Sequence, residues 1–164
     1  MRAEHYCTLF DSNFLPPGLC LHESLSRQAQ PFHLWVLCMD EKVERQLQAL
    51  ALPHVSLISL RELEEPRLLS VKPERTVAEY CWTLTPFLPF FVLDRHPSVE
   101  RVTYLDADLY FFRSPSLLLD EFSRSEAHAL ITEHAFDPSY DQSETSGRFC
   151  VQFMTFRNSP EAQY

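Results

Sequence analysis

Two carboxylates one residue apart are the side chains in this sequence best suited to chemistry. Asp106 and Asp108 follow an apolar run at residues 102–105, and a second apolar stretch at residues 109–112 comes directly after them. Such a pair suits a hard divalent cation, which takes oxygen ligands and often bridges carboxylates to phosphate oxygens. The spacing therefore indicates a site for a metal-bound diphosphate. The alternative is an ordinary solvated turn, because Asp also accepts hydrogen bonds from backbone N–H groups in turns and at helix starts.

The run before the acids must position them. Residues 102–105 are β-branched, aromatic or aliphatic, so they predict a short buried strand with Asp106 and Asp108 at its carboxyl end. In open parallel α/β sheets ligands bind at that edge. The apolar neighbours on both sides place the acids in a partly dry setting, where an unpaired carboxylate is costly and a metal compensates its charge.

The rest of the chain alternates strand and helix patterns. Strands are predicted at residues 6–10, 32–39, 55–60, 127–132 and 150–156, and helices at residues 19–28, 41–50 and 116–122. Asp40 is placed to cap the second helix. Residues 79–93 predict a buried helical segment interrupted by Pro86 and Pro89. This order predicts an α/β fold, with a mainly parallel central sheet flanked by helices, in a single domain over residues 1–164.

Composition narrows the class of protein. The chain has 164 residues, 45% of them hydrophobic, and a net charge of −9, with its Lys and Arg residues scattered. This favours one globular domain and excludes a basic surface for nucleic acid. No apolar stretch is long enough for a signal peptide or a membrane span, and five scattered cysteines suit reduced thiols. We therefore expect a soluble cytoplasmic protein without a transmembrane segment.

Glycine is too scarce for the common nucleotide-binding loops. Gly18 and Gly147 are the only two glycines, whereas a Rossmann fingerprint needs three within six residues and a Walker loop needs two with a Lys. Both loops are excluded. If a nucleotide binds, a metal and side chains must neutralise its phosphates in place of a glycine-lined cradle.

Four blocks in order carry a family resemblance: residues 8–14 (TLFDSNF), 80–86 (YCWTLTP), 104–108 (YLDAD) and 147–153 (GRFCVQF). Together they resemble GT-A-fold glycosyltransferases and are most similar to glycosyltransferase family 8 and its bacterial relatives. The resemblance covers nearly the whole chain. Such enzymes usually continue well past the position of Tyr164, so the resemblance implies the N-terminal, donor-binding part of an incomplete GT-A domain.

The resemblance also implies roles for the matching residues. Asp11 and Asn13 stand where family members contact the uracil and ribose of a UDP-sugar, and Phe14 stands where an aromatic ring stacks on the base. Asp106 and Asp108 match the acids that bind Mn²⁺ or Mg²⁺, which bridges the diphosphate. The sugar would then pass from the nucleotide to a hydroxyl of a carbohydrate or other acceptor.

The chain departs from the family pattern in three places. Trp82 stands where many members carry an Arg, and Cys150 and Gln152 replace an Asn and a Gly expected near the donor sugar. The family's third metal ligand, a His, falls beyond the last residue. Gln152 remains a candidate contact for the donor sugar. So does His134 at the start of the polar loop 133–148, although an ordinary loop residue is the alternative.

Two other functions fit parts of the pattern. A phosphatase of the haloacid-dehalogenase type also uses Asp-x-Asp at a strand end, but it needs Thr or Val where Tyr110 stands and has its motif near the start of the chain. A non-catalytic sugar-nucleotide-binding or assembly module is the other alternative. In that case the apolar segment 79–93 would face a partner.

The glycosyltransferase interpretation makes four structural and functional expectations. Asp11, Asn13 and Phe14 should face Asp106 and Asp108 in a single cleft. Nucleotide should bind only with a divalent metal. The 164-residue chain should bind the donor yet transfer sugar poorly. The sheet edge beyond residue 156 should be exposed, which would invite self-association.

Overall fold

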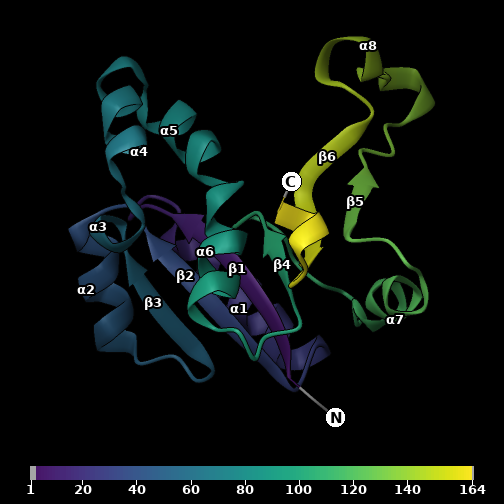
Figure 1. Cartoon of the computed structure of the whole chain (residues 1–164), viewed down its shortest axis with the longest axis horizontal. Helices are drawn as coiled ribbons and strands as arrows, with labels where there is room; N and C mark the ends of the chain where they lie inside the picture. Colours follow the sequence, from purple (N-terminus) through teal and green to yellow (C-terminus); the bar gives the residue numbers. More distant parts are fainter. Residues whose placement is uncertain (1–2, 164) are drawn as a thin grey trace.

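The computed structural model of the protein describes residues 3–163 and shows a six-stranded sheet with helices on both faces (Figure 1). The strands are β1 (Glu4–Phe10), β2 (Phe32–Cys38), β3 (Val55–Ser59), β4 (Arg101–Leu105), β5 (Ala129–Glu133) and β6 (Phe149–Arg157). The longer helices are α1 (Leu15–Gln28), α2 (Glu41–Leu50), α5 (Val77–Leu84), α6 (Phe87–Arg95) and α7 (Ser116–Arg124). The short elements are α3 (Leu60–Leu63), α4 (Pro66–Val71), α8 (Ser143–Ser146), η1 (Lys72–Glu74), η2 (Pro138–Tyr140) and η3 (Pro160–Gln163). Within residues 3–163, no helix combines the length and the apolar character needed to cross a membrane.

The strand order is β3-β2-β1-β4-β6-β5. Strands β1 to β4 are parallel, and β6 runs antiparallel to both of its neighbours, β4 and β5. The predicted α/β fold with a mainly parallel sheet is confirmed. The order also reverses direction at β1, since β2 and β3 continue on one side and β4 lies on the other. In open α/β sheets such a switch point leaves a crevice at the carboxyl ends of the strands.

The expectation of an exposed sheet edge beyond residue 156 is wrong. The chain crosses to the outer strand β5 first and returns as β6, so β6 lies inside the sheet. Phe156 pairs with Val102 of β4 on one side and with Ala129 of β5 on the other. The sheet therefore ends in β3 and β5, and the backbone groups of β6 are paired on both sides over this part of the strand.

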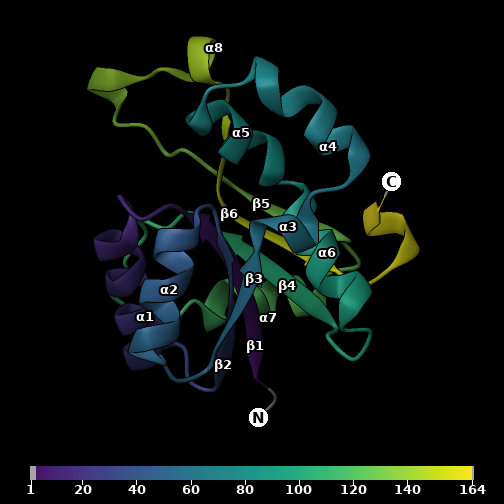
Figure 2. The same cartoon turned by 90° about the vertical axis from the view of Figure 1, so that its left-hand side faces the viewer.

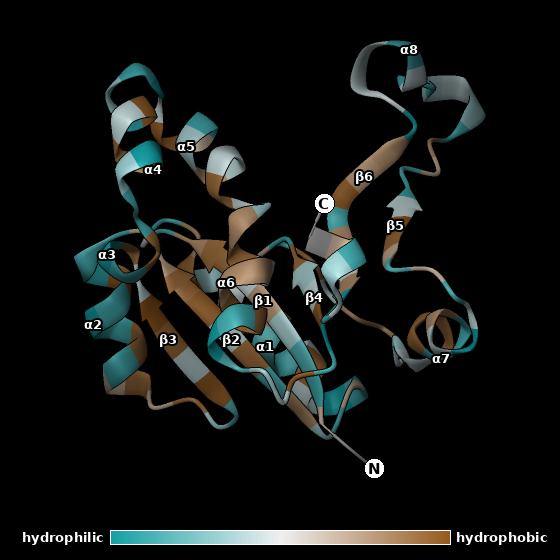
Figure 3. Cartoon of the chain, in the orientation of Figure 1, coloured by the Kyte–Doolittle hydropathy of each residue, from teal (hydrophilic) through white to brown (hydrophobic). Residues whose placement is uncertain are grey.

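The inner strands are apolar on both faces because helices cover both. In β2, Leu34 and Val36 pack in one cluster with residues of α1 and α2, while Leu37 packs in the cluster on the other face. Figure 2 shows α1 and α2 on one side of the sheet and α6 on the other, and Figure 3 shows β2 and β3 mostly brown beside the teal α3. This is the pattern expected of strands covered twice, whose sequence reads as a continuous apolar run.

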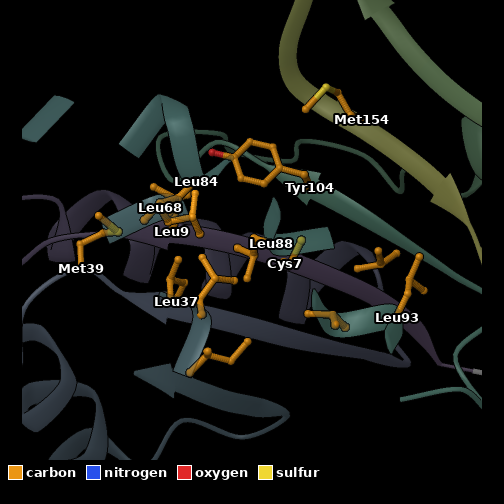
Figure 4. Close-up of a cluster of buried hydrophobic side chains, with 14 of the residues drawn as sticks. Cys7, Leu9, Leu37, Met39, Leu68, Leu84, Leu88, Leu93, Tyr104 and Met154 are labelled. Carbon is orange, nitrogen blue, oxygen red and sulfur yellow. The ribbon is translucent and has the colours of Figure 1, made fainter. Parts of the chain in front are cut away.

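The cluster on the α6 face joins the centre of the sheet to the helices that precede β4. Cys7 and Leu9 of β1 meet Leu84 of α5 and Leu88 of α6, and Tyr104 of β4 completes the contact (Figure 4). All five side chains are buried. The positions of α5 and of the two acids after β4 are therefore set by one continuous apolar core.

Helix α1 begins at Leu15, four residues earlier than the sequence predicts. Pro16 and Pro17 fall in its first turn, where proline is tolerated because those N–H groups have no partner within a helix. Gly18 follows and is buried against the ring of Phe10, where an added Cβ would lie 2.6 Å from the ring. The close approach of α1 to β1 therefore requires glycine at this position.

The apolar segment 79–93 is two helices in the structure. The chain breaks between Leu84 and Phe87, at the predicted Pro86, whereas Pro89 sits in the first turn of α6 and causes no break. Leu84 and Val92 are fully buried, but Trp82 is 70% exposed. The prediction that this segment is buried therefore holds for α6 and for one face of α5 only.

Asp40 ties the ends of β1 and β2 together. One carboxylate oxygen accepts a hydrogen bond from the backbone N–H of Val43 at 2.7 Å, which caps α2 as the sequence predicts. The other accepts from the backbone N–H of Ser12 at 2.8 Å, in the turn after β1. Burial alone would raise the pKa of Asp40, but these backbone bonds outweigh it and hold the pKa below its usual value.

Three histidines that the sequence leaves unconnected gather around one tryptophan. Trp35 of β2 lies 4.5 Å from the ring of His33 and 4.1 Å from the ring of His96, and His5 of β1 lies 5.9 Å from His33. Burial lowers the pKa of His5 and of His33, and the neighbouring imidazoles add to the effect, while the charge of Glu4 opposes it at His5. The folded protein therefore favours the neutral imidazoles of His5 and His33.

The histidine group predicts a loss of stability in mild acid. Because the pKa of His5 and of His33 is lowered by folding, the unfolded chain takes up protons first as the pH falls through about 6.5. We expect the free energy of unfolding in urea to decrease between about pH 7 and about pH 5.5, before most carboxylates titrate. His33→Gln should flatten this dependence, and an unchanged slope in that variant would contradict the assignment.

Asp40 predicts a second effect on stability. Asp40→Ala removes the cap of α2 and the bond to Ser12, and should lower the free energy of unfolding by about 1–2 kcal/mol. Asp40→Asn keeps one acceptor oxygen, so its unfolding midpoint should fall between those of the unaltered chain and of Asp40→Ala. Asp120→Ala, which removes an exposed acid from α7, is the matched control. Equal midpoints for Asp40→Ala and this control would refute the role.

Candidate functional site

The candidate site is a pocket where the chain leaves β1 and β4. These strands are parallel neighbours, with Cys7 opposite Tyr104, so the segments after them emerge at the same edge of the sheet (Figure 1). The pocket has a volume of about 400 Å³. Its lining residues are Leu9, Phe10, Asp11, Phe14, Val77, Ala78, Cys81, Trp82, Thr85, Tyr104, Asp106, Ala107 and Asp108. The structure thus brings Asp11 and Phe14 together with both acids of the Asp-x-Asp pair.

The turn after β1 is held by its own carboxylate. One oxygen of Asp11 accepts hydrogen bonds from the backbone N–H groups of Asn13 at 2.9 Å and Phe14 at 3.1 Å. The other oxygen accepts from the side-chain amide of Asn13 at 3.0 Å. Asn13 therefore turns its amide toward Asp11 and does not contribute to the pocket lining. The turn leaves the ring of Phe14 at the pocket rim, 50% exposed.

The two acids lie in different surroundings. Asp106 is partly buried, and its backbone N–H donates to the carbonyl of Gln152 in β6 at 3.0 Å. Asp108 is exposed. The hydroxyl of Tyr104 donates to Asp106 Oδ1 at 3.0 Å, and the hydroxyl of Thr85, the residue that follows α5, donates to Tyr104 at 3.4 Å. This chain of contacts links Asp106 to the carboxyl end of α5.

The charge on Asp106 is incompletely compensated. Burial raises the pKa of its carboxyl, the bond from Tyr104 opposes that shift, and the nearby charge of Asp108 adds to it. A bound cation would supply the missing opposite charge. Among residues 3–163, no group of three or more His, Cys, Asp or Glu side chains is placed to hold a metal. Two carboxylates still fit Mg²⁺ or Mn²⁺, since such ions often combine one or two carboxylates with waters and substrate phosphates.

One wall of the pocket was missed by sequence reasoning. Helix α5 contributes Val77, Ala78, Cys81 and Trp82, which recur at helical spacing on one face of the helix. The helix starts with a capping box, in which Thr76 accepts from the N–H of Glu79 and Glu79 accepts from the N–H of Thr76. The signal was present as Thr-x-x-Glu before an apolar helix, but apolar residues on two faces made α5 read as wholly buried.

The two candidate contacts for the donor sugar lie outside the pocket lining. His134 follows β5, where its backbone N–H donates to Arg148 and its ring stacks on Phe136 at 4.6 Å. Gln152 of β6 adjoins the acids through its backbone carbonyl, which accepts from Asp106. The structure therefore brings Gln152 beside the site by its main chain, whereas His134 belongs to the projecting segment between β5 and β6.

Comparison with known proteins shows two relatives by sequence. No family model matches the chain. The uncharacterized protein YfnD of Bacillus subtilis (strain 168) is 33% identical over 163 residues, which cover 99% of this chain and 52% of that protein. YfnF of the same strain is 32% identical over 160 residues, covering 93% of this chain and 52% of that protein. The chain thus spans about half the length of the curated relatives it matches.

Comparison of structures shows the fold. Galactosyltransferase LgtC, solved with donor and acceptor sugar analogs, superposes with a TM-score of 0.63 at 13% identity, covering 98% of this chain and 60% of that one. Mouse xyloside xylosyltransferase 1 superposes with a TM-score of 0.61 at 17% identity, covering 99% of this chain and 69% of that one. Glycosyltransferase GlyE of Streptococcus pneumoniae TIGR4 superposes with a TM-score of 0.57 at 16% identity, covering 99% of this chain and 36% of that one. At these identities the likeness shows the fold alone, and the chain has the GT-A-like α/β fold that these glycosyltransferases share.

Proposed function

We propose that this chain is the donor-binding part of a metal-dependent glycosyltransferase that takes its sugar from a nucleoside-diphosphate sugar, a UDP-sugar in the first instance. The observation that carries the proposal is the meeting of Asp11 and Phe14 with Asp106 and Asp108 in one pocket at the switch point of the sheet. This is where open α/β sheets bind ligands. The similarity of the fold to glycosyltransferases, one of them solved with donor and acceptor sugar analogs, supports it.

In this proposal the two acids hold a divalent cation in the pocket. Asp106 and Asp108 supply carboxylate oxygens, which are the ligands that Mg²⁺ and Mn²⁺ prefer. When bound, the ion would offset the negative charge of the diphosphate, including the charge that develops as the nucleotide leaves. The Tyr104 hydroxyl fixes the orientation of Asp106 by donating to one of its oxygens.

The nucleoside would lie beside the turn after β1. Phe14 offers a ring that lines the pocket. Asp11 Oδ1 accepts two hydrogen bonds within the turn and Oδ2 accepts one, so Oδ2 can accept one further bond from a ligand. Family 8 is the branch that the sequence blocks resemble, and the acceptor would present a hydroxyl group to the sugar. The structure does not favour the phosphatase alternative, because the acids follow the fourth strand and the three solved structures compared above are glycosyltransferases.

A second candidate function is a module that binds the sugar nucleotide without turning it over. It is favoured by the small number of metal-binding side chains: among residues 3–163 no group of three or more His, Cys, Asp or Glu is placed to hold a metal, and the third carboxylate that lines the pocket, Asp11, already accepts the hydrogen bonds of its own turn. Binding and turnover are therefore tested separately.

The first test is metal-dependent binding of UDP. We expect calorimetric titration to show UDP binding with Mg²⁺ or Mn²⁺ and at least about tenfold weaker binding with EDTA. Without the cation, the negative diphosphate would lie against the negative carboxylates of Asp106 and Asp108 with no counterion between them. Asp106→Asn or Asp108→Asn should remove the difference between the two conditions. Asp106→Asn should keep its thermal stability, since burial already disfavours the charge. Equal affinity with metal and with EDTA in the unaltered chain would exclude a bridging ion.

The second test is sugar transfer. We expect the 164-residue chain to bind UDP with metal but to release UDP only slowly from UDP-sugars offered with hydroxyl acceptors. Transfer requires both reactants to be held in place, and in this proposal the residues that line the pocket serve the donor. UDP release from a panel of UDP-sugars measures this. Many turnovers per chain would show that the acceptor site is complete within these residues.

A further inference from the structure

A buried carboxylate outside the candidate pocket is bonded to helix α5. Glu64 directly follows α3, and its side chain is only 9% exposed, whereas that of its ion-pair partner Lys72 is 42% exposed. A charged group at that depth lowers the stability of a fold unless it is paired and hydrogen-bonded. The partners of Glu64 are therefore what allows this carboxylate to be buried.

One oxygen of Glu64 accepts two hydrogen bonds. Oε1 accepts from the hydroxyl of Tyr80 at 2.9 Å and from the ammonium of Lys72 at 2.6 Å. The ammonium also lies 5.2 Å from the centre of the Tyr80 ring. Burial raises the pKa of the Tyr80 phenol, and the bond to Glu64 adds to the shift, so the phenol keeps the proton that it donates. The three side chains form one connected cluster.

The cluster joins three elements that are separate in sequence. Glu64 is the residue after α3, Lys72 begins η1, and Tyr80 lies in the first half of α5. Figures 1 and 2 both show α4, which lies between α3 and η1 in the chain, beside α5 at one end of the sheet. The cluster therefore fastens α5 to the segment that runs alongside it.

The two halves of α5 are held by different contacts. Leu84 near the carboxyl end is buried in the core, and Thr85, the next residue, bonds to Tyr104 of β4. The capping box at the amino end joins only neighbours in sequence. The bond from Tyr80 to Glu64 therefore supplies a polar link between the first half of α5 and another element.

The position of α5 sets one side of the candidate pocket. The residues of the helix that line the pocket are Val77, Ala78, Cys81 and Trp82. Tyr80 falls between them in sequence but is 3% exposed and packs in the core cluster. Tyr80, Glu64 and Lys72 are not among the lining residues. A change in their contacts would reach a bound ligand through α5.

We propose that Glu64 is a positioning residue: by holding Tyr80 and Lys72 on one oxygen, it fixes the first half of α5 and, with it, the α5 side of the pocket. A buried ion pair adds little net stability, because desolvation costs about as much as the attraction gains. In this proposal its contribution is to select one arrangement of the elements that it joins. The effect on a bound nucleotide rests on the proposed function, whereas the effect on α5 does not.

The first test measures amide hydrogen exchange in α5 without a ligand. Tyr80→Phe removes only the hydroxyl, and Glu64→Leu removes the acceptor oxygen. Each should speed exchange in α5 by about tenfold and leave exchange in α2 unchanged. Glu64→Gln keeps Oε1 as an acceptor for both partners, so its α5 should exchange nearly as slowly as that of the unaltered chain.

Glu62→Leu is the matched control. Glu62 belongs to the same short helix, accepts from the backbone N–H and the hydroxyl of Ser59, and is not a lining residue. This change should leave exchange in α5 as it is. Equal exchange in α5 for Tyr80→Phe and the unaltered chain would overturn the proposal. So would a rise of the same size in α2 and α5, because it would reflect global stability alone.

The second test measures UDP binding in Mg²⁺ by calorimetry, at a temperature at which circular dichroism shows every variant folded. Tyr80→Phe and Glu64→Leu should each weaken binding about three- to tenfold, and Glu64→Gln should retain the affinity. The double variant Tyr80→Phe, Glu64→Leu should lose little more than Glu64→Leu, because both changes break the same bond.

The two proposals fail in different ways. If the unaltered chain does not bind UDP with Mg²⁺, the proposed function fails, and hydrogen exchange still decides whether Glu64 fixes α5. If the unaltered chain binds UDP and both Tyr80→Phe and Glu64→Leu bind it equally well, the proposed function stands and the positioning role of Glu64 in the pocket fails.

Discussion

The parallel pairing of β1 with β4 is the constraint on which the candidate site depends. Nearly a hundred residues separate the two strands in sequence, yet Cys7 and Tyr104 lie directly opposite each other. Because parallel strands end at the same edge of a sheet, this pairing brings the turn at Asp11 to the acids at Asp106 and Asp108. Between them, α1 and α2 cover one face of the sheet and α6 covers the other, and the chain returns to the same end (Figure 2).

The pairing is stabilised by apolar contacts on both faces and extended by polar contacts at its end. Cys7, Leu88 and Tyr104 are part of one buried cluster. From that cluster the Tyr104 hydroxyl reaches Asp106, and the backbone of Asp106 reaches Gln152 in β6. The partly buried acid is thus held by neutral partners that orient it without cancelling its charge. Such an arrangement keeps a partly uncompensated charge beside the pocket at the expense of some stability.

Apolar side chains that line the pocket are also left exposed to solvent at a cost in stability. The turn after β1 and the capped start of α5 position Phe14 and Trp82 so that both rings line the pocket and stay largely exposed. Apolar surface that a folded chain leaves exposed beside charged groups is typical of ligand sites. In this fold the exposed apolar surface and the incompletely compensated charge occur in one pocket.

The sequence by itself determined the elements and the chemistry of the acids. The continuous apolar run of β2, the cap at Asp40 and the acids after β4 are local signals, because periodicity and capping depend on neighbours along the chain. Only the tertiary structure decided the place of β6 between β4 and β5, which rests on pairing between distant segments. It also decided the early start of α1, whose prolines fit a first turn once Gly18 packs on Phe10. Trp82 is the clearest case: an apolar residue in an apolar helix predicts burial, and only the direction of α5 over the sheet shows which of its two apolar faces meets the pocket.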